Sequence, residues 1–456
     1  YNFISEVVQE SVWHNDHAKH RISEKIDRIL THKFFGLLIL VGVLLIVFQA
    51  IFSWARLPMD LLENGFGALQ DLVRSSMPPG ILTDLISDGM IAGVGGVVVF
   101  LPQILLLFLF ISLLEDSGYM ARAAFLMDKL MSRVGLHGKA FLPLMSSFAC
   151  AIPGIMATRT IESRRDRFAT ILIAPFMSCS ARLPVYTLMI ATFFAGQYVF
   201  GVVSLGALLM LAMYALGIAV AIVVAFLLKR TVLKAPPPPF VMELPPYRLP
   251  NLRTVIQNML TRAWLFLKRA GTVILAISII LWALTYFPRS SQHSAISSQQ
   301  SAATSVNGDA NADSEQIKQS YAGQLGHAIE PAIRPLGFSW KIGVALIASF
   351  AAREVLVSTL SIIYNVGKDE DAQSETLVSA VKDAKRDDGT PEWTPLTGLT
   401  LMVFFVLAMQ CMSTLAVVRR ETNSWRWPIF MFGYMTVLAY VGAFLTYHGG
   451  KALGFE

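Results

Sequence analysis

The chain has 456 residues, of which 54% are hydrophobic and only 15% are charged, whereas a soluble globular domain carries about 25% charged residues. This composition argues against an ordinary soluble enzyme and favours a membrane protein. The net charge of +6 could attract nucleic acid. Lys and Arg residues are, however, spread over the loops beside apolar stretches, which is typical of cytoplasmic loops of membrane proteins, so no nucleic-acid partner is expected.

Several uncharged stretches are long enough to cross a bilayer, which takes about 20 residues of α-helix. They are Phe34–Trp54, Gly89–Leu114, Ala140–Thr158, Ala270–Pro288, Trp393–Val418 and Trp427–Gly450. Between Phe168 and Leu228 the only charge is Arg182, so this run must hold two crossings, with a turn near Gly196. The alternating pattern of a membrane β-barrel is absent. The sequence therefore predicts an all-α polytopic membrane protein with about 7–9 transmembrane helices.

Loop composition divides the chain into regions. We expect a soluble helical connector (1–33), a first transmembrane half (34–228), a basic, proline-rich cytoplasmic linker (229–269) and a second transmembrane half (270–448). The segment 289–325 is rich in Ser and Gln, and the segment 366–392 is acidic. Both are predicted to be mobile external loops, because basic loops stay in the cytoplasm and polar segments cannot bury a core.

A weak internal repeat appears when the chain is shifted by 202 positions. Identical pairs include Gly135/Gly337, Lys139/Lys341, Ser147/Ser349 and Phe148/Phe350. The repeat defines two gate regions, gate 1 (89–194) and gate 2 (326–418). The stretch 140–158 is short and contains Pro143, Pro153 and Gly154, which predicts a broken or re-entrant helix. If 139–158 and 341–362 both enter the bilayer and return, basic loops fall inside, acidic loops fall outside, and the halves are inverted copies; ordinary crossings are the alternative.

Cysteines, hydroxyls and thioethers gather at these predicted helix breaks. The candidate ligands are Cys150, Cys179, Cys411, Ser147, Ser178, Ser180, Met177 and Met409. Thiolates, hydroxyls and freed carbonyls could replace the water shell of a divalent transition metal in a membrane pore. The competing interpretation is structural, because free Cys and Met are common packing residues and Ser often bonds to the preceding helical turn.

Ionisable residues inside apolar spans are costly, and they are usually functional or paired. Arg182 lies in the middle of its span, and Arg353 and Glu354 lie in the second re-entrant element. We interpret Glu354 as a candidate cation ligand and the two arginines as gate residues or counter-ions, with structural pairing as the alternative. Glu115 and Asp116 close a span at the predicted cytoplasmic face, where they could receive an exiting cation or form a solvated helix end.

Catalytic motifs do not occur in the sequence. It has no phosphate-binding G-x-x-x-x-G-K-[ST], no zinc-binding H-E-x-x-H and no nucleophile elbow G-x-S-x-G, so the sequence leaves open whether the protein is an enzyme. The leading hypothesis is transport of a divalent transition metal. Two alternatives are a transporter of nucleosides or other small polar solutes and a membrane sensor that moves nothing.

The sequence resembles the membrane region of the bacterial ferrous iron transport protein B family from about residue 20 onward. The resemblance rests on Arg28–Lys33, on Leu114–Phe125, on the surroundings of Cys150 and Cys179, and on Ser349–Glu354. It implies Fe²⁺ uptake across the bacterial inner membrane by a multi-pass protein, with Cys150, Cys179 and Cys411 lining the iron path. In that family an N-terminal domain, missing here, binds GTP and Mg²⁺. Small cytoplasmic accessory proteins and a homo-oligomer are further expected partners.

Overall fold

The computed structural model describes residues 26–32, 34–78, 80–136, 138–199, 203–234, 247–288, 320–350, 353, 355–364, 374–386, 389–409 and 411–455. Nearly all described elements are helices, as predicted, and the exception is a short hairpin of β1 (Tyr198–Val199) and β2 (Val203–Ser204). This hairpin lies beside the predicted turn at Gly196, whose φ of +73° suits glycine. Most of the predicted connector 1–33 lies outside the described residues.

The first half begins with helices that form an outer wall. They are α3 (Phe35–Trp54), α4 (Arg56–Ser76), α5 (Ile81–Asp84), the π-helical η1 (Leu85–Ile91), α6 (Ala92–Val98) and α7 (Leu101–Asp116). The predicted span 89–114 is therefore part of a longer helical run that bends at Val99 and Phe100. Exposed apolar side chains cover α3, as expected of a helix that faces lipid.

Gate 1 follows as a series of short, interrupted helices. It comprises α8 (Tyr119–Arg133), η2 (Gly138–Ala140), α9 (Phe141–Ala149), α10 (Ala151–Ala157), η3 (Thr158–Thr160), α11 (Arg164–Ile173), η4 (Ala174–Phe176), η5 (Ser180–Arg182) and α12 (Leu183–Phe193). The long helix α13 (Leu205–Arg230) then completes the half. Pro153 and Pro184 lie in the first turns of α10 and α12, where a missing N–H costs nothing, so these helices start after each break.

The second half repeats this order of elements. It comprises α14 (Leu252–Phe266), the π-helical η6 (Leu267–Gly271), α15 (Thr272–Tyr286), α18 (Tyr321–Ile333), η7 (Arg334–Leu336), α19 (Trp340–Ala348), α20 (Val355–Ile363), α21 (Glu375–Asp383), α22 (Pro395–Leu407), α23 (Met412–Thr422) and α24 (Arg426–Ala452). Three segments that were predicted as a linker or loops contain helices. The linker 229–269 includes α14 and the first residues of η6. The predicted mobile loops 289–325 and 366–392 include the start of α18 and the whole of α21, because apolar residues of these segments pack on the core.

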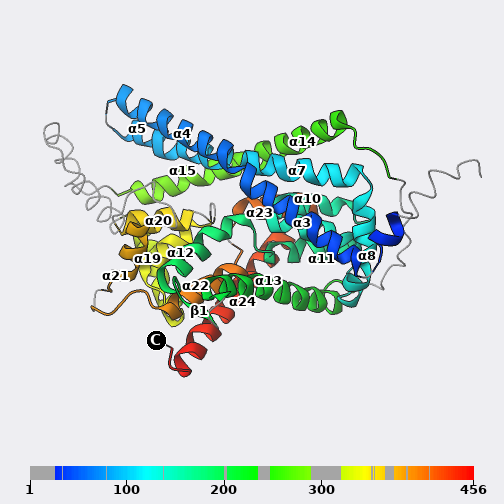
Figure 1. Cartoon of the computed structure of the whole chain (residues 1–456). Coiled ribbons are helices and arrows are strands. Elements are labelled where there is room, and N and C mark those ends of the chain that lie inside the picture. Colours follow the sequence, from blue (N-terminus) through cyan, green and yellow to red (C-terminus); the bar gives the residue numbers. More distant parts are fainter. Residues whose placement is uncertain are drawn as a thin grey trace, which may run out of the picture.

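The repeat predicted from the sequence is visible in the structure. Gly135 and Gly337, which are 202 positions apart, both adopt a φ of +81° just before the re-entrant elements. The helices α9 and α10 fold back on each other at Cys150, so that Gly154 packs against Ser147. The helices α19 and α20 also pack together. In Figure 1, α10 and α11 lie toward one end of the molecule and α19 and α20 toward the other; the inversion of the two halves stays a prediction.

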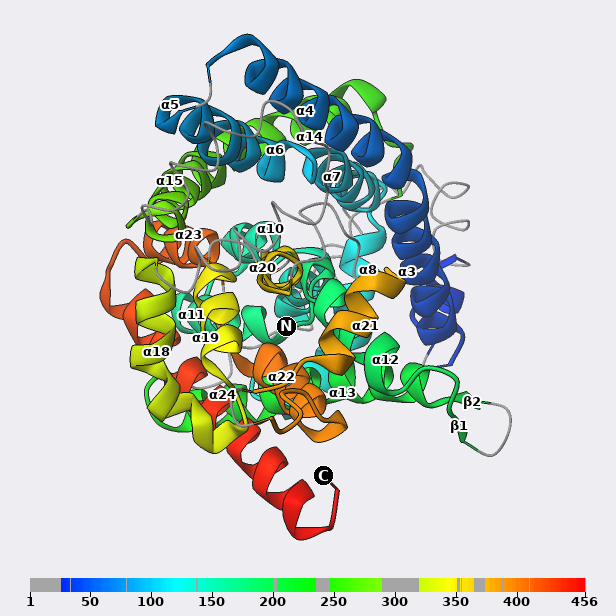
Figure 2. The ribbon, with the colours of Figure 1, turned by 90° about the vertical axis from the view of Figure 1, so that its left-hand side faces the viewer.

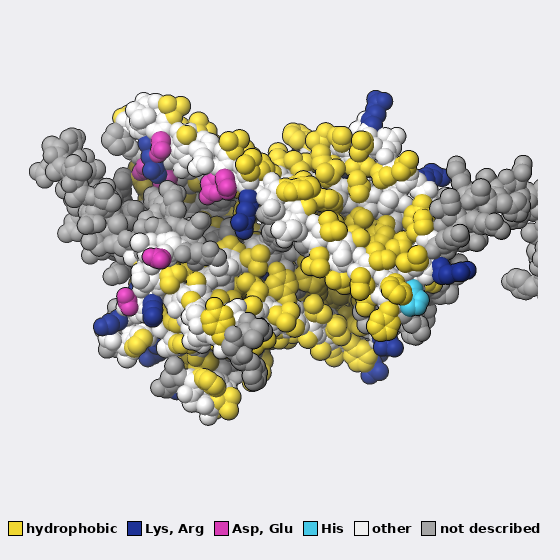
Figure 3. Space-filling view, viewed as in Figure 1, with side chains coloured by type: hydrophobic (Ala, Val, Ile, Leu, Met, Phe, Trp, Pro, Cys, Tyr) yellow, Lys and Arg dark blue, Asp and Glu magenta, His cyan; other side chains and the backbone are white. Residues whose placement is uncertain are grey.

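Six helical runs in the described residues are long and apolar enough to cross a membrane, and Leu275–Tyr286 is a shorter apolar helix. Figure 2 shows α10 and α20 near the centre of the molecule, with α3, α4 and α7 on one side and α22 and α24 on the other. In Figure 3 a broad apolar surface separates one end rich in Lys and Arg from the opposite end, where the acidic side chains gather. The fold is an all-α polytopic membrane fold.

Candidate functional site

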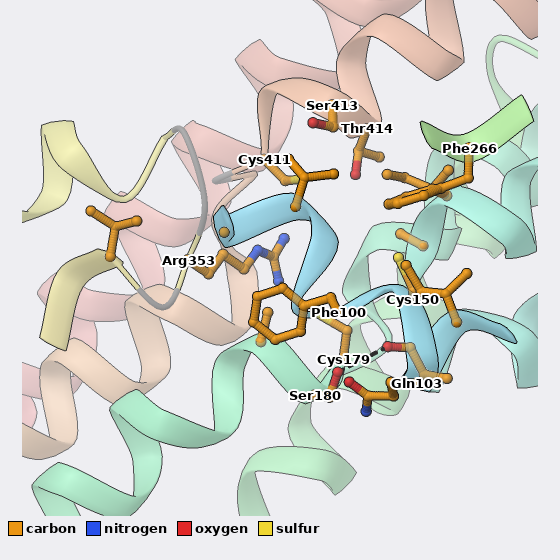
Figure 4. Close-up of a pocket in the computed structure, with 18 of the residues that line it drawn as sticks. Phe100, Gln103, Cys150, Cys179, Ser180, Phe266, Arg353, Cys411, Ser413 and Thr414 are labelled. Carbon is orange, nitrogen blue, oxygen red and sulfur yellow. Dashed lines mark hydrogen bonds between the residues drawn. The ribbon is translucent and has the colours of Figure 1, made fainter. Parts of the chain in front are cut away.

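A cavity of about 240 Å³ lies where the interrupted helices meet. Its wall combines α6, α7, α14 and α15 with the tip of the α9–α10 hairpin, the break between η4 and η5, Arg353 and the start of α23. Figure 4 shows side chains from both halves of the chain pointing into this space. Residues of both gates therefore line the same cavity.

All three cysteines line this cavity and none forms a disulfide. Each lies at the start of a helix: Cys150 precedes α10, Cys179 precedes η5 and Cys411 precedes α23. Cys150 and Cys411 have extended backbones, with φ of −158° and −161°. The helix interruptions thus bring together thiols that are up to 261 positions apart.

The predicted hydroxyl and thioether ligands divide into two groups. Ser180 and Met177 line the cavity, and Ser180 Oγ donates a hydrogen bond of 3.3 Å to the carbonyl of Ala149. Ser147 Oγ instead donates to the carbonyl of Pro143 at 2.7 Å, the structural role expected of a helical serine. Ser178 and Met409 are buried beside the breaks, but they are not part of the described cavity wall.

Arg182 is fully buried and donates hydrogen bonds to backbone carbonyls at both helix breaks. Its guanidinium donates to the carbonyls of Pro175 at 2.9 Å and Met177 at 3.1 Å, and it also reaches the carbonyl of Ala408 in the second break at 3.5 Å. These carbonyls would otherwise lack donors inside the membrane. Each of these carbonyls therefore accepts a hydrogen bond from Arg182, and whether they also contact a metal stays a prediction.

Arg353 reaches the cavity from gate 2. Its side chain is 4% exposed, and Nη1 lies 3.7 Å from the Cys179 sulfur, within hydrogen-bonding distance. Figure 4 shows the guanidinium extending into the cavity. A cation on the protein thus contacts one of the thiols. The neighbouring Glu354, predicted as a cation ligand, lies outside the described residues.

Glu115 and Asp116 lie away from the cavity and join α7 to α14. The Glu115 carboxylate pairs with Arg262 at 3.1 Å, and Asp116 accepts a hydrogen bond of 2.8 Å from the backbone N–H of Asn251. Asp116 thereby receives an N–H at the start of α14. Both carboxylates thus have structural partners at the basic end of the molecule.

Four polar residues of the cavity wall were not predicted from the sequence, and one of them is Ser278 on α15. Gln103 on α7 and Ser413 and Thr414 on α23 supply an amide and two hydroxyls to the wall. Ser413 is 1% exposed, and its Oγ has no hydrogen-bond partner among the described residues. Two features of the sequence could have indicated these residues. Gln103 is a polar residue inside an apolar span, and Ser413 and Thr414 closely follow Cys411.

The described wall of the cavity offers several kinds of ligand atoms to a cation. Sulfur, hydroxyl and amide groups are available, and no carboxylate belongs to the described lining. Within the described ranges, no group of three or more His, Cys, Asp or Glu side chains is close enough to hold a metal ion. A conduction path requires binding weak enough for the ion to leave, whereas storage and structural sites surround the metal completely.

The apolar helical runs, the interrupted helices and the shared cavity define a multi-pass membrane protein with two gate regions. Residues 97–193 and 267–425 match the Gate family, described as "Nucleoside recognition". Residues 210–262 match the family described as "Ferrous iron transport protein B C terminus". The chain belongs to the FeoB family of the bacterial inner membrane.

Relatives match almost the whole chain. It is 44% identical to "Fe(2+) transporter FeoB" of Leptospira biflexa over 99% of this chain and 63% of that protein, and 38% identical to that of Campylobacter jejuni over 99% and 69%. A Porphyromonas gingivalis relative, "Fe(2+) transport protein A/Fe(2+) transporter FeoB fusion protein", is 42% identical over 99% of this chain and 54% of that protein. The chain thus spans less than two thirds of its Leptospira relative. No solved structure matches it significantly.

Proposed function

We propose that this chain is the membrane region of a ferrous iron uptake transporter and that its cavity is part of the Fe²⁺ path. The observation that carries the proposal is the convergence of Cys150, Cys179 and Cys411 on one interior cavity. Thiolates are suitable ligands for soft and borderline transition metals. The names of the relatives favour iron over a nucleoside transporter or a sensor.

In this proposal Fe²⁺ enters from the acidic end, exchanges part of its water shell for sulfur and hydroxyl ligands in the cavity, and leaves toward the basic, cytoplasmic end. Cys150 and Cys179 are the principal ligands, with Ser180, Met177 and Cys411 beside them. Ser147, Ser178 and Met409 support the helix breaks. Glu354 remains a proposed ligand at the tip of the second hairpin.

Arg353 is proposed as the gate residue of this path. Its guanidinium and Fe²⁺ would compete for the Cys179 sulfur, because two cations cannot share that position without strong repulsion. The arginine must therefore move aside when the ion enters. Arg182 has a supporting role, since its contacts with backbone carbonyls fix both helix breaks. Glu115 and Asp116 could contact an exiting ion only after leaving their present partners.

The relatives also suggest how the protein is regulated and which partners it has. The part of the Leptospira relative outside the match is where we place a GTP- and Mg²⁺-binding domain that controls transport. The Porphyromonas fusion protein supports a small cytoplasmic accessory protein as a partner. Homo-oligomerisation is a further proposal, and light scattering of the purified protein in detergent measures it directly.

Uptake of radioactive Fe²⁺ into proteoliposomes tests the proposal. A Cys150→Ser/Cys179→Ser variant should lose at least about tenfold in initial rate, because oxygen binds a soft cation more weakly than sulfur does. Met189→Leu is the matched control, since it removes a buried sulfur outside the cavity wall. Unchanged metal-dependent uptake by the double variant would refute the thiol path.

A further inference from the structure

A second pocket lies at the basic end of the membrane region, away from the cysteine cavity. Its volume is about 530 Å³, and its wall includes Arg164 at the start of α11, Asn423 and Ser424 in the turn after α23, and Arg426 and Trp427 at the start of α24. Nothing in the proposed iron path uses this pocket.

The surroundings of the pocket are strongly basic. The segments 159–167, 229–234 and 419–426 contain ten Lys and Arg residues and three acidic residues. Each acid already has a partner: Glu421 pairs with Arg159 and Arg167, Asp166 pairs with Lys229, and Glu162 pairs with Lys139. Basic side chains therefore remain in excess around the pocket.

Two arginines of the pocket wall are available for a ligand. Arg164 and Arg426 are exposed, and neither forms an ion pair with an acidic side chain of the described residues. Arg164 lies over the ring of Phe168 at 5.4 Å, which fixes its side chain beside the pocket. Guanidinium groups bind phosphate oxygens through paired N–H donors. A phosphate between the two arginines would compensate charge that the protein leaves unpaired.

The aromatic residues place this pocket at the membrane surface. Trp427 and Phe430 belong to its wall, and Trp425 beside it is 58% exposed, with Arg419 lying over its ring at 4.4 Å. Tryptophan is enriched at the head-group level of membranes. From there α24 runs into the apolar region and presents exposed side chains such as Ile429, at 65%, which acyl chains can cover.

We propose that this pocket binds the phosphate of an anionic phospholipid of the cytoplasmic leaflet, with Arg164 and Arg426 as the phosphate ligands. Basic residues beside a transmembrane helix attract anionic lipids. The aromatic side chains and the apolar surface of α24 favour a lipid over a soluble phosphate compound, because they provide contacts for the glycerol and acyl parts.

Native mass spectrometry of the purified chain tests the proposal, with phosphatidylglycerol or phosphatidylcholine added as the probe. The wild type should retain phosphatidylglycerol preferentially, and Arg164→Ala/Arg426→Ala should reduce its retention about tenfold, in line with the attraction of two basic residues near a membrane surface. Arg164→Lys/Arg426→Lys should restore part of the retention. Arg248→Ala/Arg253→Ala is the matched control, because it removes two exposed charges elsewhere at the basic end.

Three outcomes would overturn the proposal. The first is equal retention of the anionic and the zwitterionic lipid by the wild type. The second is undiminished phosphatidylglycerol retention by Arg164→Ala/Arg426→Ala. The third is competition by inorganic phosphate or glycerol phosphate at the same concentrations as the lipid, which would identify a soluble phosphate ligand. Thermal unfolding of each variant in detergent establishes that it is folded. Iron uptake is not part of this readout, so the lipid site and the iron path can fail separately.

Discussion

The two re-entrant hairpins share a backbone plan but carry different chemistry. The α9–α10 hairpin turns at Cys150, whereas beyond α19 the second hairpin presents Arg353. Each hairpin begins at a lysine that pairs with a glutamate further along the chain: Lys139 with Glu162 at 2.7 Å, and Lys341 with Glu392 at 2.8 Å. The two hairpins thus share their backbone geometry and the anchoring ion pair. Their tips differ, because the first carries the thiol of Cys150 and the second carries the guanidinium of Arg353.

The anchoring pairs also differ in burial. The Glu162 side chain is 87% exposed, whereas that of Glu392 is 1% exposed and also accepts hydrogen bonds from Ser339 and Tyr364. In addition, each repeat supplies an arginine to the other, since Arg182 reaches a gate 2 carbonyl and Arg353 reaches a gate 1 thiol. The anchoring pair of the second hairpin is therefore buried, whereas that of the first hairpin is solvent-exposed.

The largest expected effect is that of removing the arginine that joins the two breaks. Arg182→Met keeps most of the side-chain volume but leaves buried carbonyls of both repeats without donors, each at a cost of about 1–3 kcal/mol. We expect a loss of about 4 kcal/mol in unfolding free energy, measured by thermal or denaturant unfolding in detergent. A variant as stable as the wild type would show that Arg182 does not hold the repeats together.

The next largest loss of stability is expected at the buried anchoring pair, and a variant of each pair allows a direct comparison. Glu392→Gln should destabilise the protein by about 3 kcal/mol, because it leaves the partly buried Lys341 without its counter-charge. Glu162→Gln should change stability by less than about 0.5 kcal/mol, because that pair is largely solvated. The same unfolding measurement covers both variants. Equal effects would show that the burial of the second anchoring pair does not make it more important for stability than the first.

A smaller loss of stability should follow when a methyl group is added between the two helices of the first hairpin. In Gly154→Ala the added Cβ would collide with Ser147 Oγ and lie 2.6 Å from the carbonyl of Pro143, forcing α9 and α10 apart. Overpacking of this kind costs about 1–3 kcal/mol. Gly42→Ala on α3 is the control, since its Cβ meets nothing within 4 Å. Equal stability of the two variants would contradict the close packing of the hairpin.

The smallest effect concerns pH at the basic end. Burial alone would raise the pKa of Asp27, but hydrogen bonds from Arg122 and Tyr247 and the charge of Arg122 outweigh burial and lower it. A lowered folded-state pKa stabilises the contact above the ordinary value of about 3.9, and this stabilisation is lost as the pH falls through the folded pKa. The protection factors of the amides at residues 26–30, which correct for the intrinsic pH dependence of hydrogen exchange, should therefore fall below about pH 4. Asp27→Asn should show fast exchange at neutral pH as well, whereas protection unchanged by pH or by this variant would exclude the carboxylate.

The sequence predicted the repeat and the helix breaks because Pro153, Gly154 and the paired glycines leave a local signal. It also placed the cysteines correctly at these breaks. It could not predict that Arg182 binds backbone carbonyls of both repeats, or that Glu115 pairs with Arg262, because such partners depend on the packing of distant segments. The lining residue Gln103 was missed for the same reason, since which side of α7 faces the cavity is fixed only by tertiary packing.

The proposed iron path requires that sulfur contacts the transported ion inside the shared cavity. X-ray absorption at the iron edge of the Fe²⁺-loaded protein measures this directly. We predict sulfur neighbours around the iron in the wild type, with their loss in Cys150→Ser/Cys179→Ser and their retention in Met189→Leu. An iron environment made only of oxygen and nitrogen in the wild type would contradict the account.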